Sequence, residues 1–535
     1  MNRRTLLKTA TMAGLGALAA TRRALAADVE MELSPADART EINPNIYGHF
    51  IEHLGGVIYD GIWVGENSKI PNIGGIRKQF VEDMKQLAAP NIRWPGGCFA
   101  DSYHWRDGIG AREKRPRTAN FWGEMPPELH GAEPNLFGTH EFMGLCRLTG
   151  ASPYLAANVG AGSPSEFHDW ISYCNAPAGT VTLADERAAN GDATPFNVKY
   201  WGVGNESWNC GGLMKPAEYG ALYRRFTSQV PAFGQPYLIA CGPRGHSADY
   251  GVPWTEGFFD AMQGLMVRPK IDGYSVHFYT DFRPTPVSSA ESTVEEWYAV
   301  LAKGLGLEKT LVNNWAAMQK YDPSGQIKII ADEWGVWYSH NPAIAPGFQL
   351  VQMVTLRDAL HTAMHFDIFN RHADKVAMAN VAQTINCLHS LFLAHEDKYV
   401  RTPVYHVFDM YKSHMGGKFV PVKNPASEFV AGQGSGTVRV PAISSSASIM
   451  GKRMTVTLTN PSVDATRTIQ LRIAGSLRPV EAEGRVLTNE AMNAANTFLK
   501  PDQVHPTALR VDVSSDALRF ALPKQSVAAL RVQLA

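Results

Sequence analysis

The chain has 535 residues, 45% of them hydrophobic, and carries 50 Lys and Arg residues against 50 Asp and Glu residues. This length exceeds one hydrophobic core, so we expect two domains, or one large barrel with an accessory module. The charge is balanced and neither sign forms a long block, which gives no electrostatic reason to expect a nucleic acid or an anionic membrane as partner. A neutral polymer such as a polysaccharide is compatible with this composition.

The first 26 residues have the pattern of an export signal. A basic start with Arg3 and Arg4 precedes an apolar stretch over Thr9–Ala20, and Ala24–Ala26 matches a small-residue cleavage site. The arginine pair is typical of the twin-arginine pathway, although an ordinary secretion signal with an accidental pair is an alternative. We therefore predict export to the periplasm or the medium. No later stretch reaches the ~18 apolar residues of a membrane span.

Residues 43–396 alternate short apolar strands with amphipathic helical stretches, which is the pattern of βα units around a parallel sheet. A helix is expected over Ile76–Leu87, where apolar residues recur at helical spacing. Eight strands are predicted, at Ile46–Phe50, Ile92–Trp94, Tyr154–Asn158, Tyr200–Val203, Leu238–Cys241, Gly273–His277, Ile327–Ala331 and Val376–Ala382. Eight such units close most economically as a (β/α)8 TIM barrel, so the predicted fold class is α/β.

Beyond residue 397 the pattern changes to short strand-like runs separated by Gly, Pro, Asn and Ser. The runs are Met454–Thr459, Thr468–Ile473, Ala508–Val513 and Ser526–Val532. They predict an antiparallel, jelly-roll-like β-sandwich over residues 397–535. The segment Val29–Leu33 is also strand-like, so residues 27–42 are expected to join the sandwich from the N-terminal side.

The six cysteines are scattered, at Cys98, Cys146, Cys174, Cys210, Cys241 and Cys387. Without a Cys-x-x-Cys pair they argue against a structural zinc site. His361 and His365 lack the Glu of a His-Glu-x-x-His motif. We expect individual thiols, although an oxidising compartment would permit disulfides. No metal and no cofactor are predicted.

Two glutamates follow predicted strands at the rim where barrel enzymes place their chemistry. Glu206 comes after the fourth strand and Glu333 after the seventh. Hydrolysis of a glycosidic bond needs such a pair. One carboxyl group is protonated and gives its proton to the departing oxygen, and the other is ionised and attacks the anomeric carbon. A separation of about 5 Å between the two carboxyl groups implies retention of configuration. Arg93 and Tyr279 are candidates to keep Glu333 ionised, which leaves Glu206 as the acid. The alternative is that either glutamate caps a helix or pairs with an arginine.

The motifs around these residues resemble a known family. The runs Asn91–Gly97, Tyr200–Glu206 and Ala331–Tyr338 are similar to those of glycoside hydrolase family 51, the α-L-arabinofuranosidases. Ile46–Gly55 and Trp105–Gly110 extend the likeness over nearly the whole mature chain. Matches in this order are specific, whereas a lone Asn-Glu would mean little.

The resemblance implies a barrel with a sandwich completed by the N-terminal strand, no cofactor, and double displacement. It makes Glu206 the acid/base, Glu333 the nucleophile, and Asn205 the partner of the sugar 2-hydroxyl. The residues expected to line the site of the terminal furanose are Glu52, Arg93, Cys98, His277, Tyr279 and Gln383. Many family members carry Asn in place of Cys98, and Cys lacks the amide's donor and acceptor pair, so a sugar contact is lost there or supplied by water.

The predicted function is that of a retaining, exo-acting α-L-arabinofuranosidase that releases terminal arabinofuranosyl residues from hemicellulose or pectin side chains. A related retaining β-xylosidase or endo-β-glucanase of the same fold is one alternative, and a non-catalytic carbohydrate-binding barrel is another. The expected partner is an arabinose-containing oligo- or polysaccharide. The resemblance also raises the prospect of a homo-oligomer.

Overall fold

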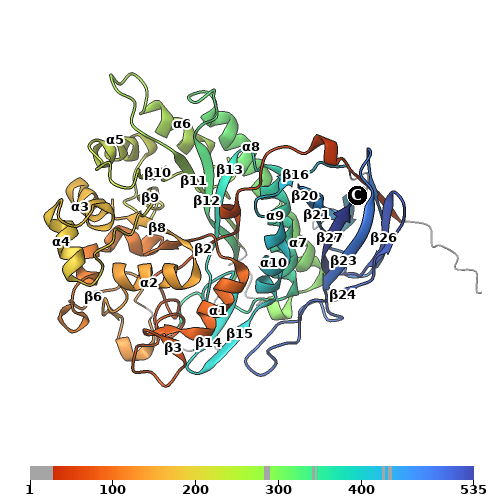
Figure 1. The fold of residues 1–535 in the computed structure, drawn as a ribbon, viewed down its shortest axis with the longest axis horizontal. Coiled ribbons are helices and arrows are strands. Elements are labelled where there is room, and N and C mark those ends of the chain that lie inside the picture. Colours follow the sequence, from red (N-terminus) through yellow and green to blue (C-terminus); the bar gives the residue numbers. More distant parts are fainter. Residues whose placement is uncertain are drawn as a thin grey trace, which may run out of the picture.

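The computed structural model describes residues 28–123, 125–281, 289–339, 341, 344–345, 348–423, 428–431 and 437–535. The export signal predicted at residues 1–26 lies outside these ranges. Within them, no helix has the length and apolar character needed to cross a bilayer. The described residues form a barrel surrounded by helices and a β-rich C-terminal domain packed beside it (Figure 1).

Eight parallel strands close the barrel, and the last pairs back to the first. In order around it they are β2 (Gly48–Phe50), β5 (Asn91–Trp94), β8 (Ser152–Ala157), β9 (Tyr200–Val203), β10 (Tyr237–Ala240), β11 (Gly273–Asp281), β12 (Lys328–Trp337) and β13 (Val376–Val381). Each overlaps one of the eight predicted strands, so the TIM barrel is confirmed.

Helices surround the barrel, and most of them bury an apolar face. In α1, for example, Phe80, Met84 and Leu87 are buried at helical spacing. The α-helices are α1 (Lys78–Leu87), α2 (Thr139–Thr149), α3 (Pro164–Asn175), α4 (Thr182–Ala189), α5 (Pro216–Thr227), α6 (Val252–Asp260), α7 (Val294–Gly304), α8 (Gly306–Met318), α9 (Leu356–Arg371) and α10 (Pro403–Tyr411). Small hairpins lie between them, formed by β3 (Asn72–Ile73) with β4 (Ile76–Arg77), β6 (Thr118–Ala119) with β7 (Ala132–Glu133), β14 (Phe392–His395) with β15 (Lys398–Arg401), and β18 (Glu428–Ala431) with β19 (Val438–Pro441).

The helix predicted to begin at Ile76 begins instead at Lys78. Ile76 and Arg77 belong to the β3–β4 hairpin. The guanidinium of Arg77 donates to the backbone oxygens of Asp60 and Gly61. These contacts hold the backbone extended before the helix. The spacing of apolar residues, on which the predicted start rests, does not depend on such contacts.

The C-terminal domain is a sandwich of two sheets. One sheet has the order β17 (Val422–Lys423), β1 (Val29–Leu33), β22 (Arg467–Ile473), β26 (Ala517–Leu522) and β25 (Asp512–Val513). The other has the order β16 (Lys418–Phe419), β20 (Ser444–Met450), β21 (Arg453–Asn460), β27 (Ser526–Leu534), β23 (Pro479–Leu487) and β24 (Thr507–Leu509). The N-terminal strand β1 joins this domain as predicted, but its pairing with β22 is parallel. The single strand predicted at Ala508–Val513 is two short strands in opposite sheets, because the chain crosses between them.

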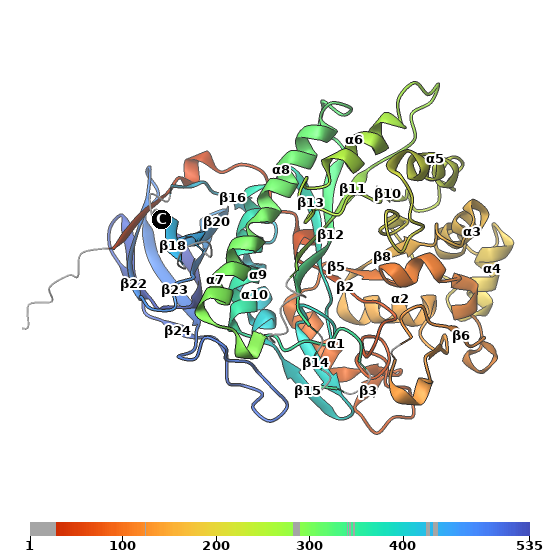
Figure 2. The same ribbon diagram turned by 180° about the vertical axis from the view of Figure 1, so that it is seen from behind.

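The helix α9 joins the two domains. All its residues except Arg371 are buried, because it lies between the barrel strands and the sandwich (Figure 2). Asp367 accepts a hydrogen bond from the Ser444 hydroxyl at 2.6 Å, and the Asn370 amide donates to Ser446 at 3.1 Å. The helix α10 packs beside α9 and α1. We therefore propose a domain boundary after α10 rather than at residue 397.

Candidate active site

Strand ends place the two candidate glutamates on the same rim. After β9 the chain turns sharply at Gly204 and Glu206, both of which have positive φ. The carboxylate of Asp101 fixes this turn by accepting from the backbone N of Asn205 at 3.1 Å and from Val159 and Gly160 at 3.0 Å each. The buried carboxylate of Asp101 therefore fixes the backbone position from which the Glu206 side chain extends.

Glu333 lies within β12, beside His277 of β11. The pairing of these strands shifts by one residue between Ser275 and His277, which indicates a β-bulge in β12. A bulge re-aims side chains, so both Asp332 and Glu333 reach the interior of the site, although neighbours on a regular strand face opposite sides. Asp332 accepts from the Tyr154 hydroxyl at 2.7 Å and lies 3.5 Å from Arg93.

The two glutamates meet as the sequence predicts. One side-chain atom each of Glu206, His277 and Glu333 lies within 4.8 Å of the others. Arg93 Nη1 donates to Glu333 Oε1 at 2.7 Å, and the Tyr279 hydroxyl donates to Glu333 Oε2 at 2.8 Å. The carboxylate spacing is close to the ~5 Å that allows one carboxylate to attack the carbon whose leaving group the other protonates.

Two hydrogen-bond donors with fixed protonation states face Glu333. Although burial opposes it, the carboxylates of Asp332 and Glu333 raise the pKa of Arg93 above its ordinary value, so this buried guanidinium is a permanent cation. Burial and the charge of Glu333 raise the pKa of Tyr279 well above 10, so its hydroxyl remains a donor. These two donors hold the Glu333 carboxylate in one orientation in the site.

His277 links the two glutamates electrostatically. Burial lowers its pKa, but Glu333, Asp332 and Glu206 outweigh burial and raise it to about 10. Nδ1 lies 3.0 Å from Glu206 Oε1, and Nε2 lies 3.2 Å from Asp332 Oδ1. Burial raises the pKa of Glu206, but the hydrogen bond and charge of His277 dominate and lower it. In the free protein the proton that an acid role requires therefore resides on His277, one hydrogen bond away from Glu206.

Two neighbouring glycines explain the Pro-Gly-Gly motif. A Cβ on Gly96 would lie 2.6 Å from Glu52 Cγ, and a Cβ on Gly97 would lie 2.6 Å from Glu333 Oε1. Side chains there would displace both carboxylates. The motif therefore allows the backbone to pass directly beneath the site.

Glu52 and Gln383 lie together on one side of the site. Glu52 Oε1 accepts from the backbone N of Phe99 at 2.9 Å and from Trp122 Nε1 at 3.1 Å. Glu52 Oε2 accepts from Gln383 Nε2 at 2.8 Å. Burial and the charge of Glu333 raise the pKa of Glu52 to about 7. The sequence-predicted residues Glu52, Gln383, Arg93, Asn205, His277 and Tyr279 thus all lie near the two glutamates.

Glu52→Gln is expected to stabilise the protein above pH 7. The folded-state pKa of about 7 lies above the ordinary value of 4.5. Stability is therefore lost as pH rises between these two values, because Glu52 ionises in the unfolded chain before it ionises in the folded protein. A neutral Gln avoids that loss. Gln383 now presents Nε2 to this position, and rotation of its amide by half a turn brings Oε1, which has no hydrogen-bond partner among the described residues, into place to accept from the new Gln. The melting temperature should exceed that of the wild type by about 2 °C or more at pH 8.

The gain should shrink at pH 5, where folded wild type is protonated at Glu52. Glu82→Gln is a matched control, because the Glu82 side chain is 53% exposed. Equal melting temperatures for Glu52→Gln and wild type at pH 8 would contradict the assignment of Glu52 as a strained buried anion.

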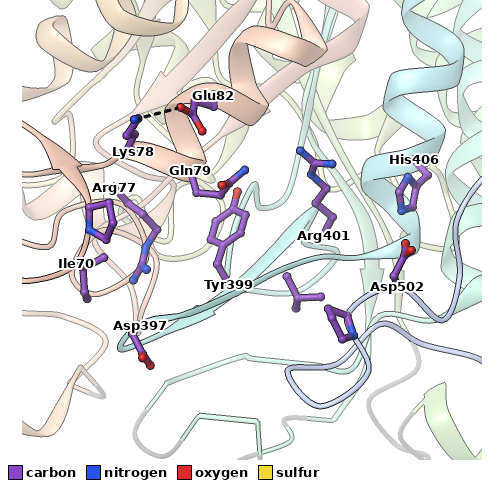
Figure 3. A pocket seen from close by; sticks show the side chains of 13 residues that line it. Ile70, Arg77, Lys78, Gln79, Glu82, Asp397, Tyr399, Arg401, His406 and Asp502 are labelled. Carbon is purple, nitrogen blue, oxygen red and sulfur yellow. Dashed lines mark ion pairs between the residues drawn. The ribbon is translucent and has the colours of Figure 1, made fainter.

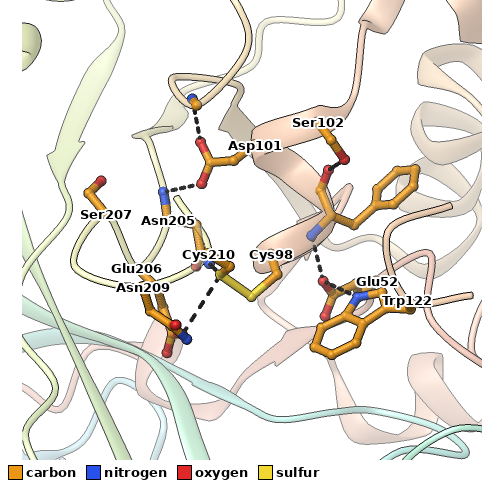
Figure 4. The surroundings of a disulfide bond; sticks show 12 residues. Glu52, Cys98, Asp101, Ser102, Trp122, Asn205, Glu206, Ser207, Asn209 and Cys210 are labelled. Carbon is orange, nitrogen blue, oxygen red and sulfur yellow. Dashed lines mark hydrogen bonds between the residues drawn. A yellow bond between two sulfur atoms is a disulfide. The ribbon is translucent and has the colours of Figure 1, made fainter. Parts of the chain in front are cut away.

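The expectation of individual thiols is wrong for two of the six cysteines. Cys98 and Cys210 form a disulfide beside Glu206 (Figure 4), and the remaining four are free and buried. The pairing joins residues 112 positions apart, which no local pattern reveals. Cys98 does lie in the site, but a disulfide sulfur has no S–H to donate to a sugar.

Sequence reasoning missed three side chains of the site, Asp101, Trp122 and Asp332. Asp332 directly precedes Glu333 in its motif, and only the bulge turns it inward. Asp101 follows the Pro-Gly-Gly motif among aromatic residues. A charged residue in such an apolar stretch indicates a buried carboxylate with a structural or functional role. Trp122 lies in a loop without periodicity, so the sequence carried no signal for it.

Two groups of described residues have metal-ligand spacing, Glu206 with His277 and Glu333, and Glu206 with Cys98 and Cys210. In the first, the raised pKa of His277 keeps its ring protonated, and a protonated imidazole has no lone pair for a metal. In the second, the sulfurs are bonded to each other and present no thiolate. The first group therefore suits proton transfer better than metal binding, and the second offers a metal only the Glu206 carboxylate.

A separate pocket of about 600 Å³ lies between α1, the β14–β15 hairpin and α10 (Figure 3). Its lining includes Arg77, Lys78, Glu82, Tyr399, Arg401 and Asp502. Neither candidate glutamate borders it. This pocket is therefore separate from the candidate catalytic residues, which lie at the rim of the barrel.

Two family models match the chain, the alpha-L-arabinofuranosidase 1 domain over residues 83–282 and the alpha-L-arabinofuranosidase C-terminal domain over residues 332–526. An intracellular exo-alpha-L-arabinofuranosidase of Bacteroides ovatus is 37% identical over 93% of this chain and 94% of its own length. A probable alpha-L-arabinofuranosidase C of Aspergillus niger is 32% identical over 73% of this chain and 75% of its own. The crystal structure of the GH51 arabinofuranosidase from Xanthomonas axonopodis pv. citri has a TM-score of 0.88 at 38% identity and covers 95% of this chain and 100% of that chain.

The predicted export is contradicted by these comparisons. The Bacteroides ovatus relative matches the chain over 93% of its length and is named as intracellular. A short basic segment followed by an apolar one is common to several kinds of N-terminus, so the pattern in residues 1–26 does not by itself identify an export signal.

Proposed function

The chain belongs to glycoside hydrolase family 51, the α-L-arabinofuranosidases, and from this premise we propose that it hydrolyses terminal α-L-arabinofuranosides with retention, using Glu206 as acid/base and Glu333 as nucleophile. The observation that carries the proposal is the unequal surroundings of the two carboxylates. Glu333 receives donors from Arg93 and Tyr279, whereas Glu206 shares a proton with His277. Two carboxyl groups with different surroundings can hold the two different roles.

The first step forms a covalent intermediate. Glu333 attacks the anomeric carbon while Glu206 donates a proton to the departing oxygen. His277 supplies that proton to Glu206 across their 3.0 Å contact. As Glu333 loses its negative charge to the new bond, the raised pKa of His277 also falls toward its ordinary value, which favours this transfer.

The second step releases arabinose. Glu206, now ionised, accepts a proton from a water molecule while the water oxygen attacks the anomeric carbon. This proton then returns to His277 across the same contact, which restores the starting protonation state. Glu333 leaves as a carboxylate that Arg93 and Tyr279 again stabilise. Two inversions at one carbon give net retention of configuration.

Asn205 is pre-oriented for the sugar. Arg93 Nη2 donates to Asn205 Oδ1 at 2.7 Å, which fixes the amide and turns its Nδ2 group away from the arginine. An Nδ2 donor beside Glu333 suits the sugar 2-hydroxyl, where hydrogen bonds strengthen in the transition state. Because Arg93 binds both Asn205 and Glu333, one guanidinium sets the relative position of the nucleophile and this contact.

The substrate is tested with a panel of aryl glycosides and polymers. We expect rapid release of para-nitrophenol from the α-L-arabinofuranoside, little from the β-xyloside, and arabinose as the product from arabinose-substituted hemicellulose or pectin. Preference for the β-xyloside or cleavage of a β-glucan would overturn the substrate assignment but not the carboxylate roles. Binding of glycan without any turnover would overturn both.

A further inference from the structure

The Cys98–Cys210 disulfide links the two loops that build the site. Cys98 begins a short helical turn after β5, and Cys210 lies in the loop after β9 that carries Glu206 (Figure 4). Cys210 Sγ lies 3.9 Å from Glu206 Oε2 and 3.8 Å from Asn205 Nδ2. Both cysteines are half-buried, so the bond borders the glutamate and is also within reach of solvent.

The loop of Glu206 is held on its other side by the segment that follows β10. The Trp208 ring donates to the backbone oxygen of Gly242 at 3.1 Å. Beyond that contact the loop turns back on itself, because the backbone N–H groups of Asn209 and Gly211 both donate to the backbone oxygen of Glu206. The turn projects outward, and Leu213 at its end is 80% exposed. The disulfide is the covalent tie that fastens this projecting turn to the loop after β5.

The tie acts together with Asp101. Asp101 belongs to the same short turn as Cys98 and accepts from the backbone N of Asn205. Glu206 is therefore fixed at its backbone by Asp101 and next to its carboxylate by Cys210. These two contacts together fix the position of Glu206 Oε2 in the site. Proton donation to a leaving oxygen depends on that position.

We propose that Cys98 and Cys210 are positioning residues whose disulfide holds the acid/base Glu206 in place, so that cleavage of unactivated leaving groups requires the oxidised pair. This inference rests on the proposed function of Glu206. Opening the bond removes the covalent link between the two loops and releases the turn. A misplacement of about 1 Å can cost on the order of 10²-fold in rate. The loss should appear only where the leaving group needs a proton.

Reduction is a balanced two-electron step with a dithiol. One thiolate of the dithiol attacks a cysteine sulfur, forms a mixed disulfide and releases the other cysteine as a thiolate. The second thiolate of the dithiol then closes a cyclic disulfide and releases the first cysteine. The protein gains two electrons and two protons, as two S–H groups, and the dithiol loses them.

The test compares two substrates before and after treatment with dithiothreitol. The values of kcat/KM, which report on the steps up to glycosylation, are measured for para-nitrophenyl α-L-arabinofuranoside and for an arabino-oligosaccharide, with thiols counted in parallel. We expect reduction to lower kcat/KM for the oligosaccharide by about tenfold or more and for the aryl substrate by less than about threefold, because nitrophenolate leaves without protonation. Reoxidation should restore the lost rate.

Variants keep the test independent of side effects of the reductant. Cys98→Ser/Cys210→Ser should show the rates of reduced wild type and no response to dithiothreitol. Cys146→Ala, which removes a buried free thiol in α2, should respond as wild type does.

Unchanged rates after complete reduction, or an equal loss on both substrates, would overturn the positioning role. In both cases an oxidised enzyme that cleaves the arabinofuranoside leaves the proposed function standing. Failure of the oxidised enzyme to cleave either substrate would instead refute the proposed function itself.

Discussion

Glu333→Ala is expected to lower kcat/KM for para-nitrophenyl α-L-arabinofuranoside by about 10⁴-fold or more, the scale on which enzymes lose activity when a nucleophile is removed. Without the carboxylate no covalent intermediate forms, and Arg93 and Tyr279 are left without the anion that they stabilise. An activated leaving group does not relieve this loss, because the missing group is the nucleophile rather than the acid.

Sodium azide tests where the nucleophile stood. In Glu333→Ala, azide can occupy the vacated space and attack once, so the product should be the inverted β-arabinofuranosyl azide. Glu82→Ala is the matched control, because Glu82 lies at the separate pocket and should retain wild-type rates. Wild-type activity of Glu333→Ala, or an azide product of retained configuration from it, would refute the nucleophile assignment.

Glu206→Ala is expected to show a loss that depends on the leaving group. General acid catalysis contributes about 10²–10⁴-fold, so kcat/KM for an arabino-oligosaccharide should fall by that range and much less for an aryl substrate with an acidic phenol. Azide should accelerate breakdown of the arabinosyl intermediate and give the α-arabinofuranosyl azide, because azide needs no general base.

The pH profile provides a second readout for the same variant. The proton shared by Glu206 and His277 is retained far above the ordinary range of a glutamate, because the pKa of His277 is raised to about 10. The wild-type rate should therefore fall only as pH rises toward that value, and the basic limb should disappear in Glu206→Ala. A uniform loss on all substrates with an unchanged profile would contradict the acid/base role.

The sequence predicted the barrel because each of its strands leaves a local signal. A run such as Tyr200–Val203 is apolar, short and followed by a turn, and these properties do not depend on the rest of the chain. The start of α1 was misplaced because a distant contact of Arg77 decides it. The two-sheet split of Ala508–Val513 was missed for a similar reason, since the crossing between sheets follows from packing.

The residues of the site likewise include some that the sequence predicts and some that it does not. Glu206 and Glu333 could be brought together from sequence because strand order in a closed barrel fixes which ends share a rim. Asp332 could not be placed, because a one-residue bulge reverses its direction. The Cys98–Cys210 pairing could not be found, because it depends on the approach of two loops whose paths the strands do not determine.

The burial of α9 between barrel and sandwich has a consequence for how the molecule can be divided. Asp367, whose pKa burial raises to about 7, relies on the Ser444 and Thr457 hydroxyls of the sandwich. A barrel separated from those strands would expose an apolar surface and strip a carboxylate of its donors. We therefore expect the two domains to unfold together, and we expect the loops at the barrel rim to tolerate exchange more readily than the domain behind it.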